Sequence, residues 1–274
     1  MSNRSSLKTK LIASPYIVWS ALFIVAPLIF VVYYSFTDAS GNFTFENIEA
    51  LSKYTPTFLR SIWFGIVATI ICLLIAFPLA YIISQKTEKV QRTLVMLVML
   101  PMWMSFLIRT YSWMALLQDT GLINSFLGKL GIEPVHMINT EGAVILGMVY
   151  NFLPYMIMPI YSVMAKLDHS MVEACQDLGG NRLTVIRKCI VPMSMPGIVS
   201  GITMVFVPSV STFYISQKLG GGSFDLIGDV IERQFQQSYN YNLGASLSLV
   251  LMVLILICMA VMNRFSGDEE GMVI

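Results

Sequence analysis

The sequence predicts an all-α integral membrane protein with six membrane-spanning helices. Of its 274 residues, 56% are hydrophobic and only 12% are charged, and the mean hydropathy is +0.71. Soluble domains carry about 25% charged residues. A helix needs about 20 mostly apolar residues to cross the hydrocarbon core of a bilayer, and six stretches of this chain meet that requirement. The composition therefore excludes an ordinary soluble domain.

The six predicted spans form one transmembrane domain, residues 1–274. The first span follows Arg4, Lys8 and Lys10, as the apolar part of a signal peptide would, but it is too long and lacks a small-residue cleavage site. We therefore expect it to be retained. Prolines within or beside the spans predict kinked helices, because proline removes a backbone hydrogen bond. The spans are expected at 11–36, 58–84, 93–117, 143–164, 193–215 and 243–262.

The distribution of basic residues predicts that both chain termini face the cytoplasm. Basic residues close to membrane spans are retained on the cytoplasmic side. With the N-terminus inside, 11 of the 17 Lys and Arg residues fall in cytoplasmic segments, five fall outside and Arg109 lies within a span. The cytoplasmic set is Arg4, Lys8, Lys10, Lys86, Lys89, Arg92, Lys166, Arg182, Arg187, Lys188 and Arg264.

The loop between the fourth and fifth spans is predicted to contain a short helix. Ser170 followed three residues later by Glu173 is a capping-box pattern, in which each side chain bonds a free backbone N–H at the start of a helix. We expect the helix to begin near Met171 and to end at Gly179-Gly180, because glycine readily adopts the left-handed conformation of a helix end. Two interpretations are open: the helix docks another protein, or it only braces the loop.

The same loop resembles the coupling motif of ABC-importer permeases, which reads E-A-A, three residues, G, nine residues, I-x-L-P. Four motif positions match in register, namely Glu173, Ala174, Gly179 and Pro192. Three positions differ, with Cys175, Cys189 and Val191 in place of Ala, Ile and Leu. The resemblance implies that residues 166–192 form a cytoplasmic coupling loop and that the four matched residues couple it to an ATPase.

The third span carries a second resemblance. Leu100-Pro101-Met102-Trp103 and Arg109-Thr110-Tyr111-Ser112-Trp113 are similar to the L-P-x-W and R-T-Y-x-W signatures of the spermidine/putrescine permeases. In a continuous helix from Thr93, Arg109 would lie about 24 Å along the axis, in the outer half of the membrane. Ionisable groups there usually pair and mark a functional path. We expect Arg109 to organise an outer gate through an acidic or carbonyl partner; alternatively, it snorkels to the outer head groups.

Aromatic side chains of the third, fourth and fifth spans are candidates for lining a cation path. Aromatic faces attract alkylammonium groups; the competing interpretation for each of them is an aromatic belt at the membrane interface. Nine acids against five bases in the outer segments suit a cationic cargo, or equally a basic partner. The candidate path or gate residues besides Arg109 are Trp103, Tyr111, Trp113, Asp119, Tyr150, Tyr155, Ser211 and Tyr214.

Two glycines in the fifth span predict close helix contact. Gly197 and Gly201 form a small-xxx-small pattern, which allows two helix backbones to approach one another. We expect this face to be exposed on the single chain and to be covered by a second permease.

Nothing in the sequence predicts a catalytic, metal or cofactor site in this chain. A P-loop needs G-x-x-x-x-G-K-[ST], and the nearest approach, at Gly128-Lys129-Leu130, lacks the first glycine and the final hydroxyl. Cys72 and Cys258 fall in spans, Cys175 and Cys189 fall at the cytoplasmic loop where thiols stay reduced, and none has metal-ligand spacing with a histidine. We expect ATP and Mg to be bound by partner ATPase subunits.

The resemblances cover nearly the whole chain and imply a type I ABC-importer permease of the bacterial inner membrane, which is not itself an enzyme. They imply partners besides the lipid bilayer: a second homologous permease, two ATPase subunits, and an extracellular or periplasmic binding protein that delivers spermidine or putrescine. No nucleic acid is expected. Two alternatives are open: a type I permease for a different small solute, because coupling motifs do not report cargo, or, more remotely, a membrane-embedded enzyme or free-standing channel. A membrane-embedded enzyme would need a cluster of ionisable groups within the membrane, and a channel would need a continuous polar stripe. A lone Arg109 supplies neither.

Overall fold

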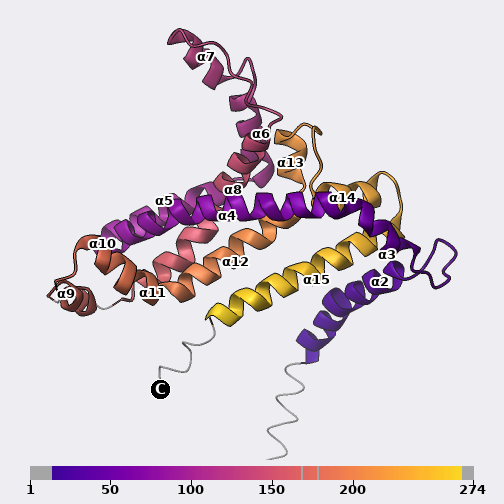
Figure 1. Cartoon of the computed structure of the whole chain (residues 1–274), viewed down its shortest axis with the longest axis horizontal. Coiled ribbons are helices and arrows are strands. Elements are labelled where there is room, and N and C mark those ends of the chain that lie inside the picture. The colour runs from indigo at the N-terminus through magenta and orange to yellow at the C-terminus, as the bar shows by residue number, and fades with distance from the viewer. Residues whose placement is uncertain (1–13, 168, 178, 267–274) are drawn as a thin grey trace, which may run out of the picture. The chain divides into compact units, whose positions relative to one another are not determined.

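The computed structural model describes residues 14–167, 169–177 and 179–266, apart from a few side chains near the two gaps and the C-terminal end. Every regular element within these ranges is a helix (Figure 1). The elements are η1 Ala21–Val25, α2 Ala26–Ser35, α3 Glu46–Ala50, η2 Leu51–Tyr54, α4 Thr55–Ser84, α5 Glu88–Trp103, α6 Phe106–Leu117, α7 Leu122–Lys129, α8 Glu141–Met164, α9 His169–Asp177, α10 Arg182–Val185, η3 Ile186–Ile190, α11 Val191–Met193, α12 Met195–Ser211, α13 Tyr214–Leu219, α14 Ile227–Gln236 and α15 Tyr241–Ser266.

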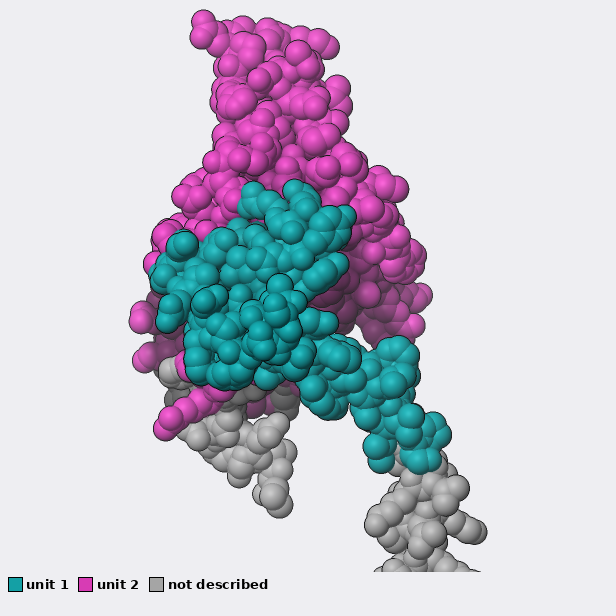
Figure 2. All heavy atoms as spheres, turned by 90° about the vertical axis from the view of Figure 1, so that its right-hand side faces the viewer, with its two compact units in different colours: residues 1–55, 230–254 teal, residues 56–229, 255–274 magenta. Residues whose placement is uncertain are grey.

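The chain groups into two compact units, coloured separately in Figure 2. Unit 1 contains residues 1–55 and 230–254, and unit 2 contains residues 56–229 and 255–274. All the path, gate and coupling residues predicted from the sequence belong to unit 2. The assignment of residues 1–274 to a single domain stays a prediction.

Four helices are long and apolar enough to cross a membrane on their own. They are Ser14–Ser35, Glu46–Ser84, Glu141–Met164 and Tyr241–Met262, and they correspond to the first, second, fourth and sixth predicted spans. Residues 11–13 of the first predicted span lie outside the described residues. Two bent pairs of helices also qualify when each pair is taken as one span, which gives up to six spans.

The third predicted span, 93–117, is broken rather than continuous. α5 and the helix that follows it meet at an angle of 87°. Pro101 in the last turn of α5 removes a helix hydrogen bond, and Met104 and Ser105 between the helices have extended backbone with ψ of 145° and 132°. The predicted position of Arg109, about 24 Å along a straight axis, is therefore wrong, because the helix changes direction before reaching it.

The fifth predicted span, 193–215, also differs from a single helix. α12 follows a bend of 70° at Ser194 and ends at Ser211, four residues earlier than predicted. Thr212 has extended backbone with ψ of 145°. The chain near Gly228 packs so closely against this point that an added Cβ would lie 2.7 Å from the backbone oxygen of Ser211. This close approach coincides with the end of α12.

α8 and α12 pack against one another at the core of unit 2. A Cβ added at Gly197 would lie 2.8 Å from the backbone oxygen of Pro159, and one at Gly201 would lie 3.2 Å from the backbone oxygen of Met156. Both glycines are buried. The prediction that this small-residue face is exposed for a second permease is therefore wrong. The fourth span of the same chain covers it, because glycine lets the two backbones approach.

Unit 1 joins the end of the first helix to the start of α15 by side-chain hydrogen bonds. Asn242 Nδ2 donates to the backbone oxygen of Thr37 at 2.7 Å, and Ser246 Oγ donates to that of Ser35 at 3.2 Å. Asn47 Nδ2 donates to Thr37 O as well, at 2.9 Å. These bonds satisfy carbonyl groups that the first helix leaves free at its C-terminal end.

Candidate functional site

The predicted coupling helix is present as α9, His169–Asp177, but it begins earlier than expected. Ser170 is the second residue of α9, whereas the predicted capping box with Glu173 would place it just before the helix. Residue 168, which precedes α9, lies outside the described residues. The predicted helix end is confirmed. Gly179 has a φ of +83°, its N–H donates to Gln176 O at 2.9 Å, and Gly180 N–H donates to Cys175 O at 3.2 Å. This pair of bonds is a Schellman motif.

The chain then leads to α12 through three short helices. Asn181 Oδ1 accepts a hydrogen bond from Thr184 N at 2.8 Å and so caps α10. α10 continues into the π-helix η3 and then α11, which leads to the bend before α12. The four matched motif residues Glu173, Ala174, Gly179 and Pro192 are all exposed. α9 to α11 thus present them on the surface at one end of unit 2 (Figure 1).

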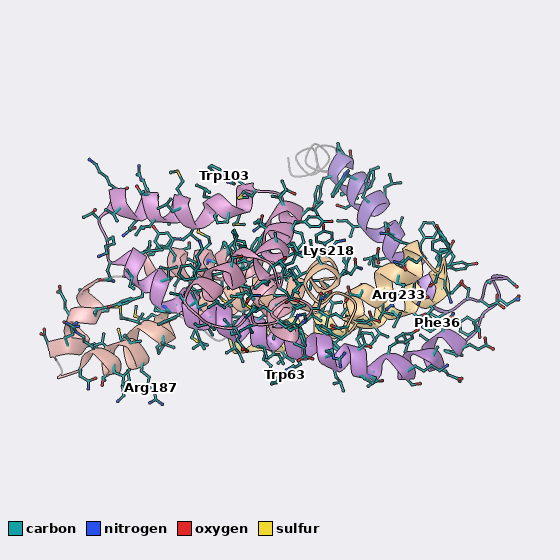
Figure 3. The ribbon with its side chains drawn as sticks, turned by 90° about the horizontal axis from the view of Figure 1, so that it is seen from above. Phe36, Trp63, Trp103, Arg187, Lys218 and Arg233 are labelled. Atoms are coloured by element: carbon teal, nitrogen blue, oxygen red, sulfur yellow. The ribbon has the colours of Figure 1, made fainter. Side chains whose placement is uncertain are left out.

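Exposed basic side chains lie on the same α9 to α11 surface. Arg187 and Lys188 lie in η3 and are exposed, and Arg182 opens α10. Figure 3 shows Arg187 projecting from the edge of unit 2. The exposed carboxylate of Glu173 therefore shares the loop with several cations. A partner surface that carries charges of both signs fits this arrangement.

The second group of predicted residues forms an aromatic cluster that we define as Phe106, Tyr111 and Tyr214. The ring of Tyr214 lies 6.0 Å from that of Phe106 and 6.2 Å from that of Tyr111, centroid to centroid. The Nζ atom of Lys218 lies 5.6 Å from the centroid of Tyr111 and 5.7 Å from that of Tyr214. These are distances at which an ammonium group is attracted by aromatic faces. Trp113 and Tyr150 form a separate T-shaped pair at 5.3 Å.

Lys218 was missed from the sequence, and the reason is the break in the fifth span. A span running to residue 215 leaves Lys218 in an outer loop. In the structure α13 begins at Tyr214, which places Lys218 one helical turn after it on the same face. The spacing of Tyr and Lys by four residues is the sequence signal that could have identified this contact.

Arg109 is buried, with 6% of its surface exposed, and this argues against snorkelling to head groups. Its Cζ atom lies 5.9 Å from the centroid of Phe106. Its Nε and Nη1 atoms are buried and have no hydrogen-bond partner among the described residues. The acidic or carbonyl partner expected for Arg109 is thus not found within the part of the chain that the structure describes. Arg109 and Lys218 place two cations beside one aromatic cluster.

Six of the predicted path residues lie outside this cluster, namely Trp113 and Tyr150 in their separate pair and the four described next. Trp103 is 75% exposed at the end of α5 (Figure 3). Tyr155 is exposed, and the centroid of its ring lies 6.5 Å from that of Phe152. The carboxylate of Asp119 contacts the exposed His136, Oδ1 to Nδ1 at 2.9 Å. The Ser211 hydroxyl donates to its own helix, to Val207 O at 3.0 Å.

A buried carboxylate, Asp229, organises the segment before α14. It is 5% exposed, and it accepts hydrogen bonds from Ser216 Oγ and from the backbone N–H of Leu226, both at 2.8 Å. Ser61 Oγ of α4 accepts the backbone N–H of Ile227 at 2.7 Å. Side chains thus satisfy two free N–H groups at the start of α14. Asp229 is one of the nine acids counted in the predicted outer segments, and in the structure it caps the start of α14.

The chain is similar to known transport proteins over most of its length. The sequence model of the family described as "Binding-protein-dependent transport system inner membrane component" matches residues 76–266. The spermidine/putrescine transport system permease protein PotB of Haemophilus influenzae is 38% identical over 81% of this chain and 81% of its own length. The PotB protein of Salmonella typhimurium strain LT2 is 36% identical over 86% of this chain and 85% of its own length.

Solved structures share the fold. A bacterial ABC transporter involved in the import of the acidic polysaccharide alginate superposes with a TM-score of 0.77 at 18% identity, over 97% of this chain and 98% of the other. The alginate ABC transporter in complex with an alginate pentasaccharide-bound periplasmic protein gives a TM-score of 0.75 at 17% identity and the same coverage. The chain has the type I ABC-importer permease fold with several membrane-spanning helices, and it belongs to the family of inner membrane components of binding-protein-dependent transport systems.

Proposed function

We propose that this chain is the permease subunit of an ATP-driven importer of spermidine or putrescine. The observation that carries the cargo assignment is the contact of Lys218 with Tyr111 and Tyr214. A primary alkylammonium group on a flexible chain already rests against two aromatic faces, and each end of a polyamine has the same chemistry. The naming of the PotB relatives supports the same class of cargo.

The proposed path lies beside the aromatic cluster, with Trp113 and Tyr150 on its α8 side. A polyamine ammonium group would displace the Lys218 ammonium from the two tyrosine rings. Arg109 and Lys218 repel a polycation directly, so passage requires a nearby counter-charge. We assign that role to a carboxylate of the second permease, which would satisfy Nε and Nη1 of Arg109. Arg109 then acts as a gate residue, closed to cations until the two permeases bring acid and guanidinium together.

The exposed loop of α9 to α11 is assigned to coupling. Glu173 and Ala174 lie on α9, Gly179 fixes its end and Pro192 starts the return to α12. Two ATPase subunits, which bind the ATP and Mg, would receive this loop and the matching loop of the second permease. Because basic residues concentrate near α5 and α9 to α11, we place this surface and both termini in the cytoplasm. A periplasmic binding protein would deliver cargo at the other side.

The test is ATP-dependent uptake of radiolabelled spermidine and putrescine in proteoliposomes that contain the whole transporter and its binding protein. Wild-type uptake of either polyamine supports the cargo assignment. Tyr214→Leu should raise the concentration for half-maximal uptake about ten-fold, whereas Tyr214→Phe keeps the aromatic face and should stay near wild type. ATPase activity without uptake of either polyamine would overturn the cargo assignment and leave a type I permease for another small solute.

Coupling is tested separately with Glu173→Ala. We expect uptake to be lost while the four subunits still assemble, because the exposed Glu173 carboxylate makes contact with the ATPase and not with its own chain's core. Asp177→Ala is the matched control, since it removes another exposed carboxylate from α9 outside the motif. Equal loss in both variants would contradict a specific role for Glu173.

A further inference from the structure

Two half-buried cysteines face one another across the coupling loop. Cys189 lies in η3, and its Sγ atom contacts the backbone oxygen of Met171 and the Sδ atom of Met193, each at 3.8 Å. Met171 and Cys175 are four residues apart in α9 and therefore lie on the same helix face. The thiol of Cys189 is thus directed at the face of α9 that carries Cys175.

The two thiols also influence one another. Burial, and next the neighbouring Cys175 thiol, raise the pKa of Cys189 above its ordinary value. The other two cysteines are placed differently: Cys72 is fully buried within α4, and Cys258 lines an apolar groove in the α15 part of unit 2. Only the pair in the coupling loop combines proximity with partial exposure among the four.

We propose that Cys175 and Cys189 are a redox modification site that forms a reversible disulfide across α9 and η3 on exposure to hydrogen peroxide. The first thiolate attacks the peroxide, becomes a sulfenic acid and releases water after proton transfer. The second thiol then displaces the sulfenic hydroxyl as another water and forms the S–S bond. Two thiols and one peroxide thus give one disulfide and two waters, and cytosolic reductants restore the thiols.

The disulfide would fix the coupling helix to the segment that leads into α12. It closes a loop that contains the Schellman end at Gly179 and the cap at Asn181. The expected consequence, which rests on the proposed coupling role, is that oxidation uncouples ATP hydrolysis from uptake.

The first experiment measures the bond itself in the fully assembled transporter. After treatment with hydrogen peroxide, free thiols are alkylated and the protein is digested for mass spectrometry. We expect a cross-linked pair of peptides containing Cys175 and Cys189, lost after dithiothreitol, while Cys72 stays reduced. Cys175→Ala and Cys189→Ile, which introduce the residues of the coupling motif, should each abolish the cross-link. Separate oxidation of the two thiols, or bonds only between chains, would overturn the proposal.

The second experiment measures the consequence. Peroxide should reduce ATP-driven uptake by wild type several-fold and dithiothreitol should restore it, while Cys175→Ala should be unaffected. A cross-link that leaves uptake unchanged would overturn the uncoupling role. Because the cross-link is read by mass, it is independent of which solute is carried, so failure of the polyamine assignment is distinguishable from failure of this proposal.

Discussion

α8 and the first helix, Ser14–Ser35, both qualify as membrane spans, but they are covered in opposite ways. In the most apolar 18-residue window of α8, 61% of residues are buried within the structure, whereas in that of the first helix 0% are buried. The difference teaches that apolar length predicts which segments cross a bilayer, while side-chain size decides what they pack against.

The residues of the two helices explain the contrast. α8 contains Gly147, which is buried and lies in contact with Ile215 of α13, and it meets Gly197 and Gly201 of α12. Small residues of this kind allow backbones to approach and gain dispersion contacts that lipid tails do not supply. The first helix, by contrast, has no glycine, and most of its side chains are exposed on the described chain.

The largest predicted effect comes from deleting apolar volume in α8. Ile157 is 2% exposed, so Ile157→Ala leaves a cavity and should lower the free energy of unfolding by about 2–5 kcal/mol. Thermal unfolding of the purified subunit in detergent measures this loss. An effect below that of a typical surface substitution would contradict the assignment of α8 to a packed core.

The next effect comes from adding volume at the α8–α12 contact. Gly197→Leu forces a side chain against the backbone oxygen of Pro159 and should destabilise the subunit by about 1–3 kcal/mol or prevent folding. Gly128→Leu in α7 is the matched control, because an added Cβ there meets no described atom within 4 Å. An equal fall in the yield of folded protein and in its unfolding temperature in both variants would contradict the role of Gly197 in letting α8 and α12 approach.

An effect of similar size is expected from removing one helix cap. Ser61→Ala leaves the buried N–H of Ile227 without its acceptor and should cost about 1–3 kcal/mol. The rate of amide hydrogen exchange at the start of α14 should rise in the same variant. Ser112→Ala serves as control, since the exposed Ser112 hydroxyl donates only to Ile108 O of its own helix at 2.8 Å. Unchanged exchange at Ile227 would show that another group caps this helix.

The smallest effect is predicted in the first helix. Ile29 is 61% exposed, so Ile29→Ala should change the unfolding free energy of the isolated subunit by less than about 0.5 kcal/mol, although it removes the same atoms as Ile157→Ala. The same variant in the assembled transporter sharpens the comparison. A clear loss of stability there, absent in the isolated subunit, would identify this face as an interface with a partner.

The sequence predicts the elements whose signals are local. The apolar stretch at 143–164 matches α8, Glu141–Met164, and the glycine pair after α9 ends that helix as its conformational freedom predicts. The fold class also follows from length and hydropathy. These features depend on neighbours in sequence, so no knowledge of tertiary contacts is needed.

Features set by distant contacts could not be predicted in this way. The break after α12 coincides with a close approach by Gly228, and the pairing of Lys218 with Tyr111 brings together α13 and α6. The burial of the Gly197 face depends on α8. In each case the deciding partner lies in another part of the chain, so spacing within one segment does not reveal it. The four-residue spacing of Tyr214 and Lys218 indicates only the contact within α13.

The break between α5 and α6 has a consequence for hydration. The last carbonyl groups of α5 lose their helical partners where the chain turns through 87°. Such groups are not tolerated against hydrocarbon and persist at membrane depth only inside protein or beside water. If this turn lies within the bilayer, the side of the third span that contains Met104 and Ser105 is therefore wetted or protein-covered, never lipid-facing.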